Sequence, residues 1–294
     1  MEIDNNPGSP FQGSIYISLT DFSSSSSSQI TVSHSRDGGA TFQTVKVGST
    51  EVIPAVNQFS DLAVGKDGTV YLSYIDCPGT GTTGDCGGTS TKIKFSKSTD
   101  GGVRWSTPTT ATTVTFAPDS CGAYYGCIPN TFERVSDIPV IAVDNSSGSS
   151  SGRLVIAFYN YTGTFMNVRV VTSSNGGTTW SAQRSVTPAS DTKDQFFPWV
   201  NISPSGLIAV TFLDRRNDPS NLKYQAFVAI SKDGNTFRNL KLASVASNPN
   251  NDGFGGGFMG DYTGNVWNGK TILTSWMDTR SGVSQDEVGG LTLP

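Results

Sequence analysis

The segment SRDGGATF at residues 35–42 returns three times further along the chain, and this repeat decides the fold. The other copies read STDGGVRW at 98–105, SSNGGTTW at 173–180 and the shorter SKDGNTF at 231–237. The aspartate or asparagine in third place can accept hydrogen bonds from the amides of its own turn, and glycine supplies the positive φ of a tight reversal. The closing Phe or Trp is expected to pack back between neighbouring sheets. Each copy therefore predicts the same tight turn.

A second repeat, rich in β-branched and aromatic residues, is typical of β-strands and precedes each turn. Its five copies lie at 14–19, 69–74, 153–158, 207–212 and 271–276. The closing aromatic residues of the four turns are 63, 75 and 57 residues apart, which is too far for one hairpin. This spacing suits a unit of four short strands with their loops.

The chain therefore divides into five units, each reading strand A, turn, strand B, loop, strand C, repeated turn and strand D. We expect a single all-β domain over residues 1–294, with a fifth unit that ends after about three strands. The units begin near Ile3, Phe59, Ile138, Phe197 and Tyr262.

The repeated turns resemble the Asp-box, or BNR, repeat of the sialidase-like superfamily, with the pattern Ser-x-Asp-x-Gly-x-Thr-Trp. Asn175 in place of Asp and Arg104 in place of Thr depart from that pattern. The resemblance implies a β-propeller of four-stranded antiparallel blades. The sequence counts five blades, whereas sialidase-like proteins usually have six, so both numbers stay open. We expect the ring to close by mixing strands from both chain ends, which leaves no exposed edge.

The composition excludes two classes of function. Charged residues are 15 % of the chain and the net charge is −4, without the basic stripe of a nucleic-acid binder. No segment reaches the 18 or more consecutive apolar residues of a membrane span. Residues 1–5 predict the start of a strand and do not form a signal peptide. We expect a monomer.

The four cysteines lie in two close pairs, Cys77 with Cys86 and Cys121 with Cys127. Four cysteines allow three pairings, of which local pairing is the simplest. Disulfides would place the protein in an oxidising compartment, secreted or at the cell surface. The alternative is four free thiols in a cytosolic protein. Zinc binding is disfavoured because neither pair has CxxC spacing and His34 is the single histidine.

Strand direction divides the expected loops between two ends of the propeller. The A–B turns share an end with the repeated turns, whereas the B–C loops and the D–A crossovers lie at the other end. The resemblance implies a ligand site at that second end. Both cysteine pairs and the Asn- and Gly-rich crossover at 247–260 belong to it.

The last residue of each strand B is acidic or an amide. Repetition in every unit favours a turn-capping role, and Asp214 and Asp278 are also kept as candidate catalytic carboxyls. The five positions are Asp21, Asp76, Asn160, Asp214 and Asp278.

Arginines at the same end differ between units and are therefore more informative. Arg215, Arg216 and Arg280 follow strands B of the fourth and fifth units, and Arg134 lies in the crossover before the third. Since arginine presents a rigid fork to carboxylates, these side chains can bind an acidic sugar. The alternative is that they pair with neighbouring aspartates and tie loops together.

The resemblance also implies a catalytic set, because sialidases use three arginines, a Tyr–Glu nucleophile couple and an Asp acid/base. Glu133 with Tyr124 or Tyr125 is the candidate couple, and Tyr262 is a second candidate nucleophile or a sugar platform. The family's N-terminal Phe/Tyr-Arg-Ile-Pro motif is absent, and the chain has few glutamates.

Three functions remain open at this stage. The first is a glycoside hydrolase acting on an acidic sugar. The second is a non-catalytic propeller that binds a glycan or a protein through an aromatic face of Trp199, Phe258 and Tyr262, and the third is a purely structural module. No cofactor is expected; a structural calcium at 217–221 or 248–252 is the alternative to plain polar loops.

Overall fold

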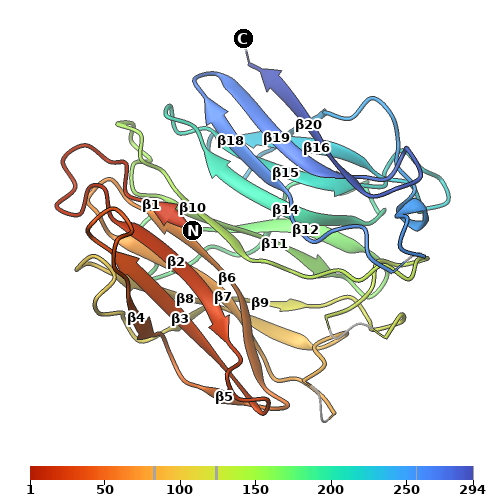
Figure 1. The fold of residues 1–294 in the computed structure, drawn as a ribbon. Helices are drawn as coiled ribbons and strands as arrows, with labels where there is room; N and C mark the ends of the chain where they lie inside the picture. The colour runs from red at the N-terminus through yellow and green to blue at the C-terminus, as the bar shows by residue number, and fades with distance from the viewer. Residues whose placement is uncertain (82–83, 123–124, 256, 294) are drawn as a thin grey trace.

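The computed structural model describes residues 1–81, 84–122, 125–255 and 257–293. Within these residues, five antiparallel sheets follow one another along the chain and lie side by side in an arc (Figure 1). One short 3-10 helix, η1 (Pro249–Asn251), interrupts the strands of the described chain. The predicted all-β propeller is confirmed, with five blades.

The blades are numbered 1 to 5 in chain order. Blade 1 contains β1 (Glu2–Ile3), β2 (Ile15–Asp21), β3 (Ser27–Ser35), β4 (Gln43–Lys46) and the short β5 (Glu51–Val52) beside β3. Blade 2 contains β6 (Val56–Val64), β7 (Val70–Cys77), β8 (Ser90–Ser98) and β9 (Thr109–Thr115). Blade 3 contains β10 (Val140–Val143), β11 (Leu154–Tyr161), β12 (Met166–Ser173) and β13 (Arg184–Ser185). Blade 4 contains β14 (Gln195–Ile202), β15 (Ile208–Asp214), β16 (Gln225–Ser231) and β17 (Arg238–Lys241). Blade 5 contains β18 (Gly264–Asn268), β19 (Thr271–Asp278) and β20 (Gln285–Thr292).

The four repeated turns join the third and fourth strands of blades 1 to 4, as predicted. In the first turn, Ser35 Oγ donates to Asp37 Oδ1 at 2.7 Å and accepts the amide of Gly39 at 2.9 Å. Asp37 Oδ1 also accepts the amide of Thr41 at 2.9 Å. Asn175 makes the equivalent contacts in the third turn, so an amide oxygen serves as well as a carboxylate.

The closing aromatic residues pack as predicted in the second and third turns. Trp105 packs on the core between blades 1 and 2, and Trp180 meets Phe95 of blade 2 edge-on at 5.2 Å. Phe42 of the first turn is instead 43 % exposed. The closing rings of blades 2 and 3 pack against the blade before them. No blade lies before blade 1, so Phe42 has no sheet to pack against.

The expected closure of the ring by mixed strands is wrong. Strand β1 pairs with β2 in blade 1, and the sheet of blade 5 contains β18, β19 and β20 alone. Packing joins each blade to the next, through β2 and β6, β6 and β10, β10 and β14, and β14 and β18. Blades 1 and 5 lie at opposite ends of this arc in Figure 1. Apolar side chains on their outer faces, such as Leu19 and Val266, are exposed.

Within the described residues, no helix has the length and apolar character needed to cross a membrane.

Candidate functional site

A cavity of about 630 Å³ opens at the end of the propeller opposite the repeated turns. We call it the axial pocket, because the start of β6 and the residues just before β10 and β18, the innermost strands of three blades, contribute to its wall. Its volume suits a small ligand. It is lined by Gln58, Phe59, Cys121, Gly122, Tyr125, Phe132, Arg134, Val135, Ser136, Phe254, Gly255, Gly257, Asp261 and Tyr262.

Aromatic rings dominate the wall of the axial pocket. Phe132, Phe254 and Tyr262 are 72 %, 70 % and 72 % exposed, although large apolar side chains are usually covered in a folded domain. Phe59 meets Tyr125 edge-on at 4.7 Å on the opposite wall. Exposed rings gathered in one pocket mark a binding surface.

Phe59 is held in an unusual backbone conformation. Its φ is 55°, in the left-handed region, where β6 bulges against β7 between Gln58 and Asp61. Bulges re-aim side chains, and strained non-glycine residues concentrate at ligand sites. The bulge turns Phe59 and Gln58 toward the pocket, where Gln58 Oε1 accepts a hydrogen bond from the Tyr125 hydroxyl.

Arg134 is the one cation in the described lining of the axial pocket. Its Nε donates to Asp261 Oδ1 at 3.2 Å, and its Nη2 donates to Asp261 Oδ2. The guanidinium also lies over the Phe258 ring, with Cζ 4.5 Å from the centroid. Its side chain remains half exposed. Arg134 is therefore fixed in direction yet open to a ligand.

Ser136 adds a polar group to the floor of the pocket. The residue is 6 % exposed, and its hydroxyl has no hydrogen-bond partner within the described part of the chain. Because a buried hydroxyl without a partner is costly, its position favours a polar group of a ligand at this point.

Both predicted local disulfides are present, Cys77–Cys86 and Cys121–Cys127. The second one supports the pocket, since Cys121 lines it and Cys127 forms a β-bridge with Arg134. Asp119 lies beside this pair, but the two sulfurs are bonded to each other and do not form a metal site.

Glu133 lies directly behind the pocket wall and is fully buried. Burial, and then the negative charge of Asp252, raise the pKa of its carboxyl to about 8. The sequence pairs Glu133 with Tyr124 or Tyr125 as a nucleophile couple. Tyr125 instead binds Gln58, and Tyr124 lies outside the described residues. A carboxyl without solvent access cannot reach a ligand in this conformation.

Arg215 does not reach the pocket, so the predicted rim position is wrong. Its side chain is fully buried, with Nη1 3.2 Å from Asp194 Oδ2 and 2.7 Å from the carbonyl oxygen of Pro129. Phe196 lies under the guanidinium at 5.5 Å. Arg215 ties the end of β15 to two crossovers.

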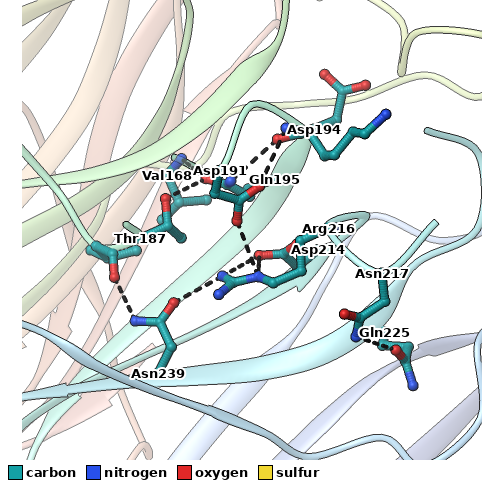
Figure 2. A network of polar contacts seen from close by, with 12 residues as sticks. Val168, Thr187, Asp191, Asp194, Gln195, Asp214, Arg216, Asn217, Gln225 and Asn239 are labelled. Carbon is teal, nitrogen blue, oxygen red and sulfur yellow. Dashed lines mark hydrogen bonds and ion pairs between the residues drawn. The ribbon is translucent and has the colours of Figure 1, made fainter. Parts of the chain in front are cut away.

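Arg216 points to the other side of the same loop and is enclosed by polar groups of blade 4, as Figure 2 shows. It contacts Asp191 at 3.1 Å and donates to Asn239 at 2.8 Å. It also pairs with Asp214, a candidate catalytic carboxyl whose pKa burial raises to about 6. Asp214 is thus a loop partner of Arg216.

Arg280 completes the predicted arginine set and has its own partners, Asp278 at 2.6 Å and Glu287. The Asp278 carboxylate also accepts the hydroxyl of Ser247 at 2.5 Å. Arg215, Arg216 and Arg280 therefore each pair with different carboxylates, and the three guanidinium groups do not converge on one ligand site. The alternative interpretation, pairing with neighbouring aspartates, describes this geometry.

Among the predicted aromatic residues, Tyr262 lines the axial pocket and Phe258 contacts its arginine. Trp199 is partly buried and lines a small cavity together with Ser136 and Asp261. The sequence did not single out Phe132, Phe254 or Ser136, which also belong to the pocket. The available signal was the position of both rings in the two longest crossovers, with Phe254 between two glycines.

The two loops considered for calcium have the geometry of plain polar turns. Asp218 accepts the amides of Ser220, Leu222 and Lys223, and Asp252 accepts those of Phe254, Gly257 and Phe258. Calcium needs inward-pointing oxygen atoms, whereas these carboxylates face N–H donors.

Comparison with solved structures matches the whole chain to enzymes that act on sugars. The α-L-arabinofuranosidase of Fusarium graminearum aligns with a TM-score of 0.56 and 14 % identity over 100 % of this chain and 76 % of its own. The NanB sialidase of Streptococcus pneumoniae aligns with 0.55 and 13 % over 100 % of this chain and 61 % of its own. The intramolecular trans-sialidase of Ruminococcus gnavus aligns with 0.53 and 12 % over 90 % and 75 %.

Neither a protein-family model nor a curated protein matches the sequence. At these identities the structural matches establish the fold, and the chain spans between about three fifths and three quarters of the three proteins named.

Proposed function

The chain is a β-propeller of the sialidase-like type, and on that premise we propose that it binds a glycan in the axial pocket. The observation that carries the proposal is the gathering of exposed Phe132, Phe254 and Tyr262 around the fixed fork of Arg134. Rings cover the apolar faces of a sugar, while Arg134, Ser136 and Gln58 offer hydrogen bonds to its hydroxyl groups.

The balance of charge favours a neutral sugar over an acidic one. Arg134 is the only described cation of the lining, and Asp261 already neutralises it. A sugar carboxylate would have to compete with Asp261 for the guanidinium.

Binding without hydrolysis fits the carboxyl groups best. Glycoside hydrolysis generally needs two carboxyl groups flanking the bond, about 5–10 Å apart. Asp261 is the single carboxyl among the described residues that line the pocket, and Glu133 is closed off behind the wall.

Hydrolysis of an acidic sugar is the second candidate, and the side-by-side position of Asp261 and Tyr262 in the pocket favours it. Fluorogenic sialosides test it directly, and fluorogenic arabinofuranosides extend the test to a neutral sugar. We expect no release of the fluorophore; release that is lost in Tyr262→Phe would replace the binding proposal with catalysis.

A glycan array tests the binding proposal. Phe132→Ala and Phe254→Ala should each weaken binding to the best glycan about tenfold or more, as expected for an aromatic anchor. Phe42→Ala is the matched control, because this ring is also exposed but lies at the opposite end. Equal binding by all variants would place the ligand elsewhere.

The two disulfides also support an extracytoplasmic location, where such bonds persist. A non-reducing peptide map of the protein purified from its source would show both bonds; free thiols would contradict this location.

A further inference from the structure

One wall of the axial pocket is built on a buried carboxylate. Asp252 is almost fully buried, and it accepts the amide of Phe254 at 2.9 Å, that of Gly257 at 3.1 Å and that of Phe258 at 3.0 Å. These bonds wrap the loop around the carboxylate. They place Phe254 in the pocket wall and Phe258 against the Arg134 guanidinium.

A second buried carboxyl faces this loop from the neighbouring crossover. Glu133 is fully buried and faces the amide of Met259 and the Asp252 carboxyl, although neither of its oxygens forms a hydrogen bond of ordinary geometry within the described residues. Asp252 is the charged group that acts on it. Glu133 also precedes Arg134 in the chain, so the two carboxyl groups lie directly behind the arginine and the rings of the pocket.

Within the described part of the chain, the nearby arginines already have partners and are not free to neutralise a second negative charge. Arg134 is directed at Asp261, and Arg215, which reaches the same crossover at Pro129, is paired with Asp194. The remaining titratable neighbour is Tyr224 at the start of blade 4, whose pKa is raised mainly by burial and is also raised by Asp278 and Glu133. Burial and the charge of Asp252 therefore disfavour an ionised Glu133, and only the amide of Met259 favours it.

We propose that the proton on Glu133 acts as a latch for the axial pocket: the neutral carboxyl lets the Asp252 loop seat against it, and loss of the proton expels the loop. In the seated state the Phe254 and Phe258 rings complete the pocket. If Glu133 lost its proton while the loop stayed seated, two like charges would face each other in a dry interior, a cost that outward movement of the loop relieves.

The latch regulates the binding site of the proposed function and rests on it for its biological meaning. The pKa of about 8 for Glu133 places the change between neutral and mildly alkaline pH. Burial moves the pKa of His34 downward, away from that range. The cysteines are all disulfide-bonded and do not titrate. Glu2, whose pKa burial raises to about 7, titrates near the lower end of that range, and the variant comparison below removes its contribution.

Residue-resolved hydrogen exchange on the ligand-free protein tests the latch without a ligand. Between pH 6.5 and 9.5, the amides of Phe254, Gly257 and Phe258 should lose about tenfold protection or more, after correction for the intrinsic rate. In Glu133→Gln, which cannot ionise, their protection should stay constant. Glu51→Gln is the control and should behave as the parent protein.

Unchanged protection in the parent, or the same loss in Glu133→Gln, would overturn the latch. With a glycan from the array, affinity should fall over the same pH range in the parent and persist in Glu133→Gln. If no glycan binds while exchange follows the prediction, the proposed function fails and the latch stands.

Discussion

The most strongly shifted carboxyl groups of the repeated turns and of the loops at the other end of this propeller shift in pKa in opposite directions. At the end of the repeated turns, Asp37 and Asp233 accept hydrogen bonds from their own turns, chiefly from Thr41 and Thr236, and these bonds lower the pKa of both. At the end with the axial pocket, Glu133 and Asp214 are buried, and burial raises the pKa of both.

This difference separates structure from function. The turns repeat the same satisfied contacts in four blades, and a cation from one blade reaches a carbonyl of the next, as Arg36 does to Asp100 at 2.6 Å. The loops at the other end differ in every blade and contain buried charges that only their surroundings maintain. Costly arrangements of this kind are expected where a protein binds its ligand.

The largest effect should come from Arg215. Removing one partner of a buried ion pair leaves the other charge uncompensated, so Arg215→Ala should cost about 3–5 kcal/mol in the free energy of unfolding. Arg280→Ala should cost clearly less, because the Arg280 side chain and its partner Glu287 are both partly exposed to solvent, although Asp278 is buried. Urea unfolding measures both. A stable Arg215→Ala protein that has lost glycan binding would restore the sugar-binding role predicted from the sequence.

The pH dependence of stability should come next. The pKa of Glu133 is about 8 in the folded protein against 4.5 ordinarily, so between these values only the unfolded state is ionised. Stability should therefore fall as pH rises from about 4.5 to 8, by up to about 1.4 kcal/mol per pH unit. Glu133→Gln should flatten this slope in urea melts at pH 5 and pH 8. A stability that rises over the same range because of Glu133 would contradict the burial of a neutral carboxyl.

The disulfides should separate stability from binding. Each closes a short loop, so Cys121→Ser with Cys127→Ser, or Cys77→Ser with Cys86→Ser, should cost about 2 kcal/mol. Cys121 lines the pocket and Cys127 bridges to Arg134, whereas Cys77 and Cys86 belong to a core cluster behind Phe59 and Tyr125, so loss of the Cys121–Cys127 bond should weaken glycan binding more. Equal effects of the two double variants on affinity would disconnect the Cys121–Cys127 loop from the pocket.

The smallest effect should arise in the repeated turns. Asp100→Ala removes the acceptor for the amide of Arg104 and should lower the melting temperature by about 2–4 °C, since one capping bond contributes about 1 kcal/mol. Asp100→Asn should change it little, because Asn175 holds the same position in the third turn. Loss of glycan binding in either variant would show that the repeated turns affect the pocket at the opposite end, and would contradict the independence of the two ends.

The blades could be predicted because their signals are local. The residues that specify a strand or a turn lie within a few positions of one another. The sequence alone therefore predicted the strands of blade 5 and the turn that has Asn175 in the place of an aspartate. Ring closure was not, because it depends on packing between blade 1 and blade 5, which no local pattern encodes.

The candidate site was predicted only in part, for a related reason. The sequence predicted the local disulfides, and it placed Arg134 and Tyr262 at the end where the axial pocket opens. It could not show that Arg215 points inward to Asp194. Nor could it show that Phe132 and Phe254, more than a hundred positions apart in the sequence, line the same pocket. Burial decides the role of an arginine or a glutamate, and burial is a property of the assembled loops.

The most direct test of the central claim is a crystal structure of the protein with the best glycan from the array. We predict a sugar ring in the axial pocket, packed on Phe254 or Tyr262, with a hydroxyl group within hydrogen-bond distance of Arg134 or Ser136. A sugar bound at the repeated turns, or in the groove between blades 1 and 2 lined by Tyr74 and Trp105, would contradict it.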